Sequence, residues 1–131
     1  MALIYHDVAV DKWPKMPQVV NEAAAQLQAQ YGEADIPGEV LKRKIEEIGD
    51  YRKDSVIPSD YCYNRLNLAP FSFKYLVLVH LGRGWYKYIG SGYPYNGPVM
   101  WKPKQERERQ VGVWKDGDCD LWEDPRQPLN S

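Results

Sequence analysis

The sequence predicts one small α+β domain in which three N-terminal helices are followed by a β-hairpin or a small antiparallel sheet. Its length of 131 residues fits a single domain, since domains cluster near about 100 to 150 residues. Hydrophobic residues make up 44% of the chain and include ten tyrosines and five tryptophans, which is enough apolar material for a core. Near residue 71 the apolar spacing changes from three and four to two, the change expected where helices give way to strands.

The first helix is expected after an extended arm. Residues 1–17 are assigned to the arm, because the pairs Trp13-Pro14 and Met16-Pro17 disfavour a helix. From residue 18 to 31 the apolar side chains recur at the period of an amphipathic helix. Gly32 suits the end of this helix, since glycine tolerates the left-handed backbone that often follows a last turn.

Two further helices are predicted. Asp35-Ile36-Pro37 favours a helix start with proline in the first turn, and an apolar stripe continues to Gly49. Residues 57–60 supply a proline and side chains that cap helices, so we expect a short third helix over 57–66. Asn67 is suited to end it.

The strands are predicted from alternation. Residues 71–80 alternate in polarity, and residues 85–89 again favour a strand. Gly82-Arg83-Gly84 supplies the turn between them, so a hairpin with Arg83 at its tip is expected. Residues 99–101 are expected to return as a third strand.

Three helices followed by a hairpin is the element order of a winged helix-turn-helix domain. In that fold the third helix enters the DNA major groove and the hairpin, or wing, lies on the phosphate backbone. We expect this winged-helix-like domain to span residues 18–103. A charged linker and an acidic C-terminal segment, extended and packed on the domain, are expected over 104–131.

Little in the sequence points to a metal or to catalysis. Cys62 and Cys119 are too far apart for the usual Cys/His metal patterns. Residues 116–120 resemble the opening of a calcium loop but lack its later glycine and glutamate. Cys62 with His80 is conceivable as a nucleophile pair, although nothing positions a base beside the thiol. The sequence therefore predicts no cofactor and no metal.

The compartment is inferred from two features. The chain opens on a polar, acidic segment rather than on a signal peptide. Its longest apolar run, residues 75–81, is far shorter than the roughly 20 residues that cross a bilayer. We expect a cytoplasmic protein without a membrane partner.

Charge is segregated along the chain. Between residues 42 and 87 nine Lys and Arg stand against five acids, a balance of +4, so the rest of the chain carries −5 of the net −1. The acids of the remainder gather in the last segment. A basic middle of this kind is suited to facing phosphate.

Candidate contacts to nucleic acid lie on the expected third helix and wing. Asn64, Arg65 and Asn67 carry the side chains that bind base edges, although Asn67 is equally suited to cap a helix and Arg65 to pair with an acid. Ser59 suits a helix cap and can help to position a phosphate. Tyr63 can stack on a base, although such tyrosines are more often part of a core.

Four cations would flank that helix on the turn and the wing. A solvated surface explains them about equally well, but lysines and arginines in such places neutralise phosphates. Arg83 is the strongest of the four, because two neighbouring glycines leave it projecting from a tight turn. The four are Lys53, Lys74, Arg83 and Lys87.

Two stretches carry a resemblance to known families. The stretch Pro58-Ser59-Asp60-Tyr61-Cys62-Tyr63-Asn64-Arg65, together with Leu81-Gly82-Arg83-Gly84-Trp85-Tyr86-Lys87-Tyr88, resembles an uncharacterised bacterial family. More distantly, residues 18–101 resemble the winged-helix modules that accompany restriction endonucleases and some chromatin proteins. The distant resemblance implies two helices before a helix that contacts DNA, and a wing that bears glycine.

These observations lead to a non-catalytic nucleic-acid-binding module, with double-stranded DNA favoured over RNA. The alternative is a protein-interaction adaptor, whose tyrosines, tryptophans and acidic tail bind a protein partner. An enzyme acting on a modified base or nucleotide is a third hypothesis, kept because the Tyr61-Cys62-Tyr63-Asn64 cluster is unusual for a helix that only contacts DNA.

Overall fold

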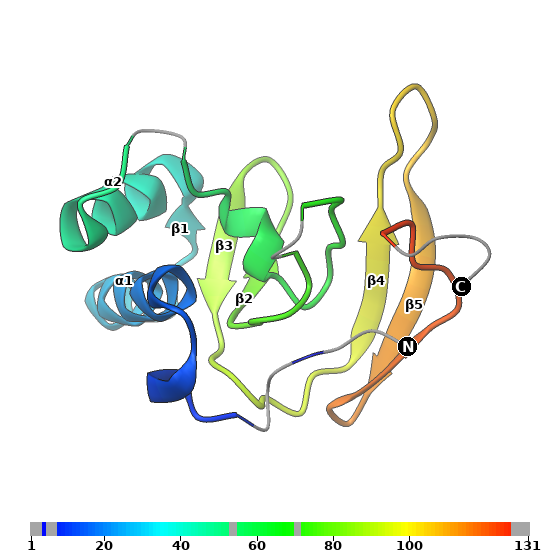
Figure 1. The fold of residues 1–131 in the computed structure, drawn as a ribbon, viewed down its shortest axis with the longest axis horizontal. Helices are drawn as coiled ribbons and strands as arrows, with labels where there is room; N and C mark the ends of the chain where they lie inside the picture. Colours follow the sequence, from blue (N-terminus) through cyan, green and yellow to red (C-terminus); the bar gives the residue numbers. More distant parts are fainter. Residues whose placement is uncertain (1–3, 5–7, 53–54, 70–71, 127–131) are drawn as a thin grey trace.

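The computed structural model describes residues 4, 8–52, 55–69 and 72–126, and it shows helices followed by two antiparallel sheets (Figure 1). The first sheet has the strand order β1-β3-β2 and the second sheet the order β4-β5-β6. The described elements are the 3-10 helix η1 (Val10–Lys12), α1 (Lys15–Tyr31), β1 (Ile36–Pro37), α2 (Gly38–Gly49), the 3-10 helix η2 (Pro58–Tyr61), β2 (Leu78–His80), β3 (Trp85–Tyr88), β4 (Gly97–Trp101), β5 (Arg109–Lys115) and β6 (Asp118–Leu121).

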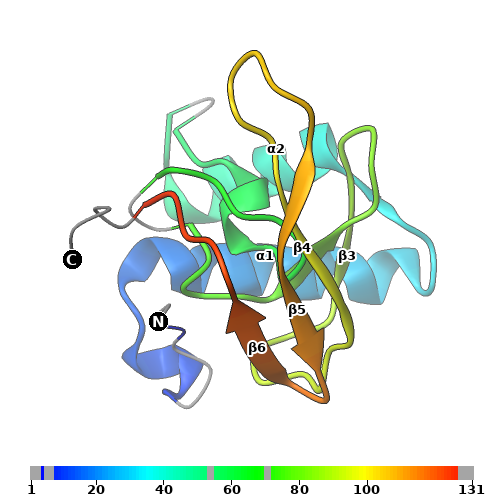
Figure 2. The ribbon, with the colours of Figure 1, turned by 90° about the vertical axis from the view of Figure 1, so that its right-hand side faces the viewer.

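The predicted winged-helix fold with three N-terminal helices is therefore wrong. Only α1 and α2 are α-helices among the described residues, and strands dominate the chain after α2. The two helices lie side by side at one end of the molecule, and the second sheet lies at the other (Figure 1). Seen from that other end, β4, β5 and β6 stand in front of the rest of the fold (Figure 2).

The two N-terminal helices form where the apolar spacing predicts them. Helix α1 begins at Lys15, so the predicted arm ends earlier than expected. Pro17 is accommodated because it lies in the first turn, whose N–H groups have no partner within the helix. Gly32 ends α1 with a φ of 66°, and α2 ends at Asp50 in the left-handed region. The buried face of α1 includes Ala23 and Ala24, whose small side chains allow close packing.

The third helix does not form. Only Pro58–Tyr61 makes a short 3-10 turn, and the connecting segment (residues 62–66) runs between the two sheets, with a turn at 63–64 and one bridge to each sheet, from Cys62 to Leu78 and from Arg65 to Met100. The Tyr63 N–H donates to the Leu78 carbonyl at 2.9 Å, and the Leu66 N–H donates to the Met100 carbonyl at 2.9 Å. Cys62, Tyr63 and Leu66 are buried and Asn64 and Arg65 are half-buried, which suits a chain packed between two sheets and not an amphipathic helix with a solvated face.

The predicted hairpin is present but shorter than expected. Strands β2 and β3 pair antiparallel across the Gly82–Gly84 turn, with Val79 opposite Lys87. Of the expected strand over 71–80, residues 72–74 form a turn instead, with Phe73 at a φ of 61°. The Asn67 N–H donates to the Ser72 Oγ at 2.8 Å and helps to hold this turn.

The remaining strands form the second sheet. The strand expected at 99–101 is part of β4, but it pairs with β5 and not with the hairpin. Strands β5 and β6 come from the segment expected to be a linker and an extended tail. The Trp114 indole N–H of β5 donates to the Tyr63 carbonyl at 2.8 Å, so this sheet is anchored on the connecting segment.

Each sheet has its own core. The helices and the first sheet enclose one cluster, which includes Val20, Ile36 and Leu41. The second cluster gathers Tyr63 and Leu66 of the connecting segment with Trp114 and other side chains of the second sheet. Within the described residues, no helix is long and apolar enough to span a membrane.

Candidate functional site

A hollow of about 400 Å³ lies where the two sheets meet, and we call it the inter-sheet hollow. It brings together the connecting segment, the end of β2, the hairpin turn, and the two ends of the loop between β4 and β5. Most of the side chains around it are polar. Its lining residues are Asn64, Arg65, His80, Gly82, Arg83, Met100 and Glu108.

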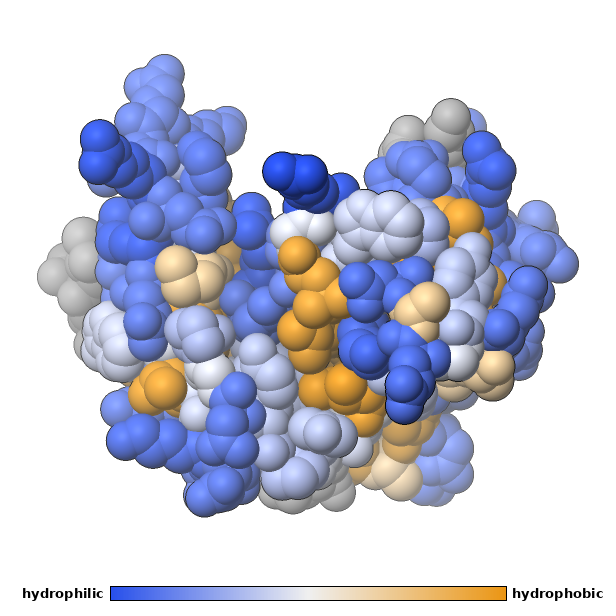
Figure 3. Space-filling model, turned by 180° about the vertical axis from the view of Figure 1, so that it is seen from behind, coloured by the Kyte–Doolittle hydropathy of each residue, from blue (hydrophilic) through white to orange (hydrophobic). Residues whose placement is uncertain are grey.

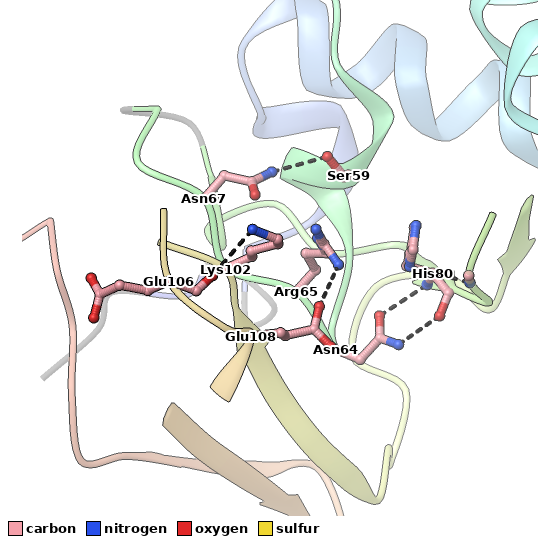
Figure 4. A network of polar contacts seen from close by, with 9 residues as sticks. Ser59, Asn64, Arg65, Asn67, His80, Lys102, Glu106 and Glu108 are labelled. Atoms are coloured by element: carbon pink, nitrogen blue, oxygen red, sulfur yellow. Dashed lines mark hydrogen bonds and ion pairs between the residues drawn. The ribbon is translucent and has the colours of Figure 1, made fainter. Parts of the chain in front are cut away.

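Asn64 holds one wall of the inter-sheet hollow by acting as a strand partner. Its Oδ1 accepts the His80 backbone N–H at 2.9 Å, and its Nδ2 donates to the His80 carbonyl at 2.7 Å (Figure 4). The amide thus satisfies both main-chain groups of His80 at the edge of β2. Because both ends of the amide are used, Asn64 has a structural role at this site.

The His80 side chain is a neutral hydrogen-bond donor. Its Nδ1 accepts the Gly82 N–H at 3.3 Å, so the neutral ring carries its proton on Nε2. Burial and the nearby Arg65 guanidinium lower the pKa of His80, against a smaller opposite effect from Glu108. At neutral pH the ring therefore contributes an N–H without a positive charge.

Arg65 lies in the inter-sheet hollow with its charge compensated. Its Nη1 donates to the Glu108 Oε2 at 3.0 Å (Figure 4), and the two side chains are 26% and 41% exposed. The pair joins the connecting segment to the loop between β4 and β5. Glu108 keeps an oxygen that no other described residue engages, so this wall presents a carboxylate acceptor beside guanidinium donors.

Arg83 stands between two hollows. It has a φ of 54°, and it is exposed at the tip of the hairpin turn. Besides the inter-sheet hollow, it lines a second hollow of about 350 Å³ toward α2, the helix-side hollow, together with Lys42 and Trp85. No described residue forms an ion pair with Arg83.

The loop between β4 and β5, residues 102–108, carries further cations. It projects at the same edge of the molecule as the hairpin turn (Figures 1 and 2). Lys102 donates to the Glu106 carbonyl at 3.2 Å, while Lys104 and Arg107 are exposed. These three cations form no ion pair with a described residue, and the carboxylate of Glu106 in the same loop pairs with Arg109.

Several of the predicted contact residues point into the protein. Asn67 Nδ2 donates to Ser59 Oγ and to Asp60 Oδ1, both at 2.9 Å. Burial raises the pKa of Asp60, partly offset by this bond from Asn67. Tyr63 is 1% exposed, and its hydroxyl donates to the Gly90 carbonyl at 2.7 Å. Tyr63 is therefore part of the interior, and Ser59 and Asn67 are half-buried and bonded to each other.

The remaining predicted cations are dispersed. Lys74 lies in the turn before β2 and does not line either hollow. The Lys87 Nζ donates to the carbonyl of Glu33, which follows the C-terminus of α1, at 3.0 Å. Lys53 lies outside the described residues. Of the nine predicted residues, the structure brings Asn64, Arg65 and Arg83 together at one hollow.

At the inter-sheet hollow, the titratable residues that the sequence prediction misses are His80 and Glu108. The sequence suggests a role for His80 only with Cys62, whose Sγ lies 3.7 Å from the Pro58 carbonyl and whose thiol pKa burial raises well above its usual value. Glu108 falls in the predicted linker. The apolar pairs Val99 and Trp101, and Val111 and Val113, flank the charged stretch and are a usable signal for a hairpin there.

Metal chemistry has no site among the described residues, since no group of three or more His, Cys, Asp or Glu is arranged to hold an ion. Residues 116 and 117, in the segment that resembles a calcium loop, form the turn between β5 and β6. Both have positive φ there, 50° at Asp116 and 85° at Gly117. This segment is therefore a hairpin turn followed by the start of β6.

A family model described as "Domain of unknown function (DUF7225)" matches residues 18–121, from the first turn of α1 to the last residue of β6. The chain is also 40% identical over 82 residues to "Uncharacterized protein YnaC" from Bacillus subtilis (strain 168). That similarity covers 62% of this chain and spans only 30% of the length of YnaC. No solved structure matches the chain.

Proposed function

Since the chain belongs to the DUF7225 family, a domain of unknown function, we propose from its own surface that it is a non-catalytic nucleic-acid-binding module. The proposed contact is the edge that carries the hairpin turn and the loop between β4 and β5. The absent third helix has no part in it.

One observation carries the proposal. Arg83 lines both hollows, and the loop that ends at Glu108 of the inter-sheet hollow carries cations without a carboxylate partner among the described residues. A nucleic acid strand presents phosphates at regular intervals, and lysines and arginines on a projecting loop and turn are typical phosphate contacts. Trp85, 43% exposed beside Arg83, supplies an aromatic face on which a base can stack.

The charge balance at this edge predicts a moderate affinity. Glu39 and Asp35 lie near Arg83, and Glu108 compensates Arg65. The net attraction therefore depends on the unpaired cations. Each phosphate contact contributes about 0.7 to 0.9 to the slope of log K against log salt. With Arg83, Lys104 and Arg107 in contact, we expect these residues to account for a slope of about 2 to 3.

The test is a fluorescence-anisotropy titration of a labelled single strand and of the corresponding duplex at two salt concentrations. The triple variant Arg83→Asn, Lys104→Gln, Arg107→Gln removes three charges, and Lys102 is kept because it holds the loop. Asparagine tolerates the positive φ at position 83. We expect weaker binding and a smaller salt dependence. Wild-type protein that binds neither substrate at low salt contradicts the proposal.

A charge-matched control comes from cations far from this edge. Lys12→Gln, Lys15→Gln and Lys115→Gln also remove three charges, from η1, the start of α1 and the end of β5, which lie away from the loop between β4 and β5 (Figure 1). We expect this control to change affinity much less than the first triple variant. Equal losses would mean that only net charge matters, and the proposed edge would be wrong.

A protein partner is the second candidate, favoured by exposed apolar side chains on the hairpin. Leu81 is 45% exposed and Trp85 is 43% exposed. Seen from behind, apolar surface gathers in the middle of the molecule between hydrophilic projections (Figure 3). Exposed tryptophans such as Trp85 commonly anchor protein interfaces. Copurification of a protein in place of nucleic acid, lost with Leu81→Ser, would favour this candidate.

A further inference from the structure

We propose that the inter-sheet hollow receives a single unpaired base of the bound strand. This inference rests on the proposed function and deepens it, because it states which part of the nucleic acid enters the hollow. The observation behind it is the combination of a carboxylate, a guanidinium and an uncharged imidazole around one opening: Glu108, Arg65 and His80.

The charge of the hollow decides between a base and a phosphate. Arg65 and Glu108 neutralise each other across 3.0 Å, and the remaining charge of the lining, Arg83, lies on the exposed hairpin turn at the rim. The imidazole of His80 is uncharged and adds no attraction for an anion. A phosphate placed here would face the Glu108 carboxylate, and like charges at close range repel each other. A neutral, polar heterocycle meets no such repulsion.

The hydrogen-bonding groups of the hollow suit the edge of a base. Arg65 and the Nε2–H of His80 are donors, and the remaining oxygen of Glu108 is an acceptor. Base edges place donors and acceptors next to one another, so they need both kinds of partner. Met100 supplies an apolar surface in the same lining. The volume of about 400 Å³ lies within the range of roughly 300 to 1,000 Å³ of small-molecule sites.

In this arrangement Arg83 contacts a phosphate of the bound strand at the rim of the hollow. It lines the inter-sheet hollow and the helix-side hollow, so a phosphate next to the inserted base can lie against its guanidinium. Trp85, in the helix-side hollow, is placed for the neighbouring base. Because a duplex must first release a base, at the cost of unpairing and unstacking, single strands are expected to bind more tightly than duplexes.

The experiment compares a single strand that carries bases with a strand of the same length made of abasic residues, by anisotropy and at one salt concentration. A base contact worth about 1 to 3 kcal/mol predicts a loss of about 5- to 150-fold for the abasic strand. His80→Ala is expected to weaken binding of the base-bearing strand and to leave the abasic strand unchanged. Equal affinity of the two strands for the wild-type protein overturns the proposal.

Glu108→Gln separates the base from the phosphate. It removes the negative charge and keeps an acceptor oxygen beside Arg65. If a base occupies the hollow, the variant binds the base-bearing strand equally or more weakly. If a phosphate occupies it, the variant binds the abasic strand and inorganic phosphate more tightly, because the repulsion is gone, and this result also overturns the proposal. Thermal unfolding of both variants checks that they fold.

Free nucleosides distinguish failure of this inference from failure of the proposed function. Binding is followed by the fluorescence of the tryptophans. Strands that bind without any difference between base-bearing and abasic forms leave the proposed function standing and refute the base pocket. Nucleosides that bind, with strands that do not, support the pocket and refute the nucleic-acid module. Absence of binding by nucleosides and strands alike refutes both.

Discussion

Asn64→Ala is the substitution whose effect follows most directly from the structure. The side-chain amide makes two hydrogen bonds to His80, at 2.9 Å to its N–H and 2.7 Å to its carbonyl. Alanine leaves both main-chain groups without this partner at a half-buried strand edge. A net 0.5 to 1.5 kcal/mol for each bond gives a loss of about 1 to 3 kcal/mol in the free energy of unfolding.

Urea denaturation followed by tryptophan fluorescence measures this loss. For a domain of this size the midpoint is expected to fall by about 0.5 to 2 M. Asn96→Ala is the matched control, since Asn96 Oδ1 accepts the Asp116 N–H at 2.9 Å in an exposed turn, where water can replace the lost bond. We expect less than about 1 kcal/mol for the control.

Asn64→Asp makes the test sharper. A carboxylate can still accept the His80 N–H, but it repels the His80 carbonyl, whereas a protonated carboxyl can both accept and donate. The stability of this variant relative to wild type should therefore recover as the pH falls below the pKa of the new carboxyl. A loss below about 0.5 kcal/mol for Asn64→Ala, or no recovery for Asn64→Asp, would refute the view that this side chain completes β2.

Three further predictions concern titrating groups. Burial raises the pKa of Asp60 in the folded protein, so the contribution of this group to stability is present at low pH and is lost as the pH rises through that pKa. Urea unfolding at pH 7 and at pH 4 should therefore show that Asp60→Asn stabilises the protein at pH 7 and has little effect near pH 4. Hydrogen bonds from Arg126 lower the pKa of Asp124, so the sign is opposite: Asp124→Asn should cost about 1.5 to 3 kcal/mol at pH 7 and progressively less as the pH falls through the pKa of Asp124. Cys62 is buried with a pKa well above its usual value, and Cys119 is half-buried with a pKa raised to about 12. A thiol reagent at pH 8 should therefore modify Cys119 slowly and Cys62 only when the protein unfolds. Rapid labelling of Cys62 would contradict its position in the core.

The parts of the fold that the sequence predicts are those with a local cause. Helices α1 and α2 result from the spacing of their apolar residues, and the β2–β3 turn results from Gly82 and Gly84, which adopt positive φ. These signals depend on neighbours within a few positions. They do not require knowledge of which distant segment provides the packing surface.

The third helix is predicted wrongly because its signals are equally local and are overridden by packing. Residues 57–60 do supply a turn, and it forms as η2. From the last residue of η2 onward, the three consecutive residues Tyr61, Cys62 and Tyr63 are all buried, which requires apolar surroundings on both sides of the chain. Short apolar runs of this kind do not distinguish a helix from a buried extended segment. The second sheet, which supplies one of those surroundings, comes from residues 97–121.

The candidate site divides in the same way. Arg83 can be singled out from the sequence because its turn is encoded by adjacent glycines. His80 and Glu108 cannot, because their proximity to Arg65 depends on two strands that pair with different ends of the connecting segment. A function that depends on convergence of this kind becomes visible only when both sheets are in place.

The attachment of the connecting segment to both sheets determines which substitutions can report on binding. Asn64 binds β2 through its side chain, while the main chain next to it pairs with Met100 of β4. A ligand in the inter-sheet hollow would contact both sheets and stabilise the folded protein in proportion to its affinity. Substitutions in this segment therefore change stability and binding together. Arg83 is free of this coupling, because it has no ion-pair partner among the described residues and its φ of 54° is tolerated by asparagine or glycine. A loss of binding in Arg83→Asn with unchanged unfolding would thus be attributable to the surface contact itself.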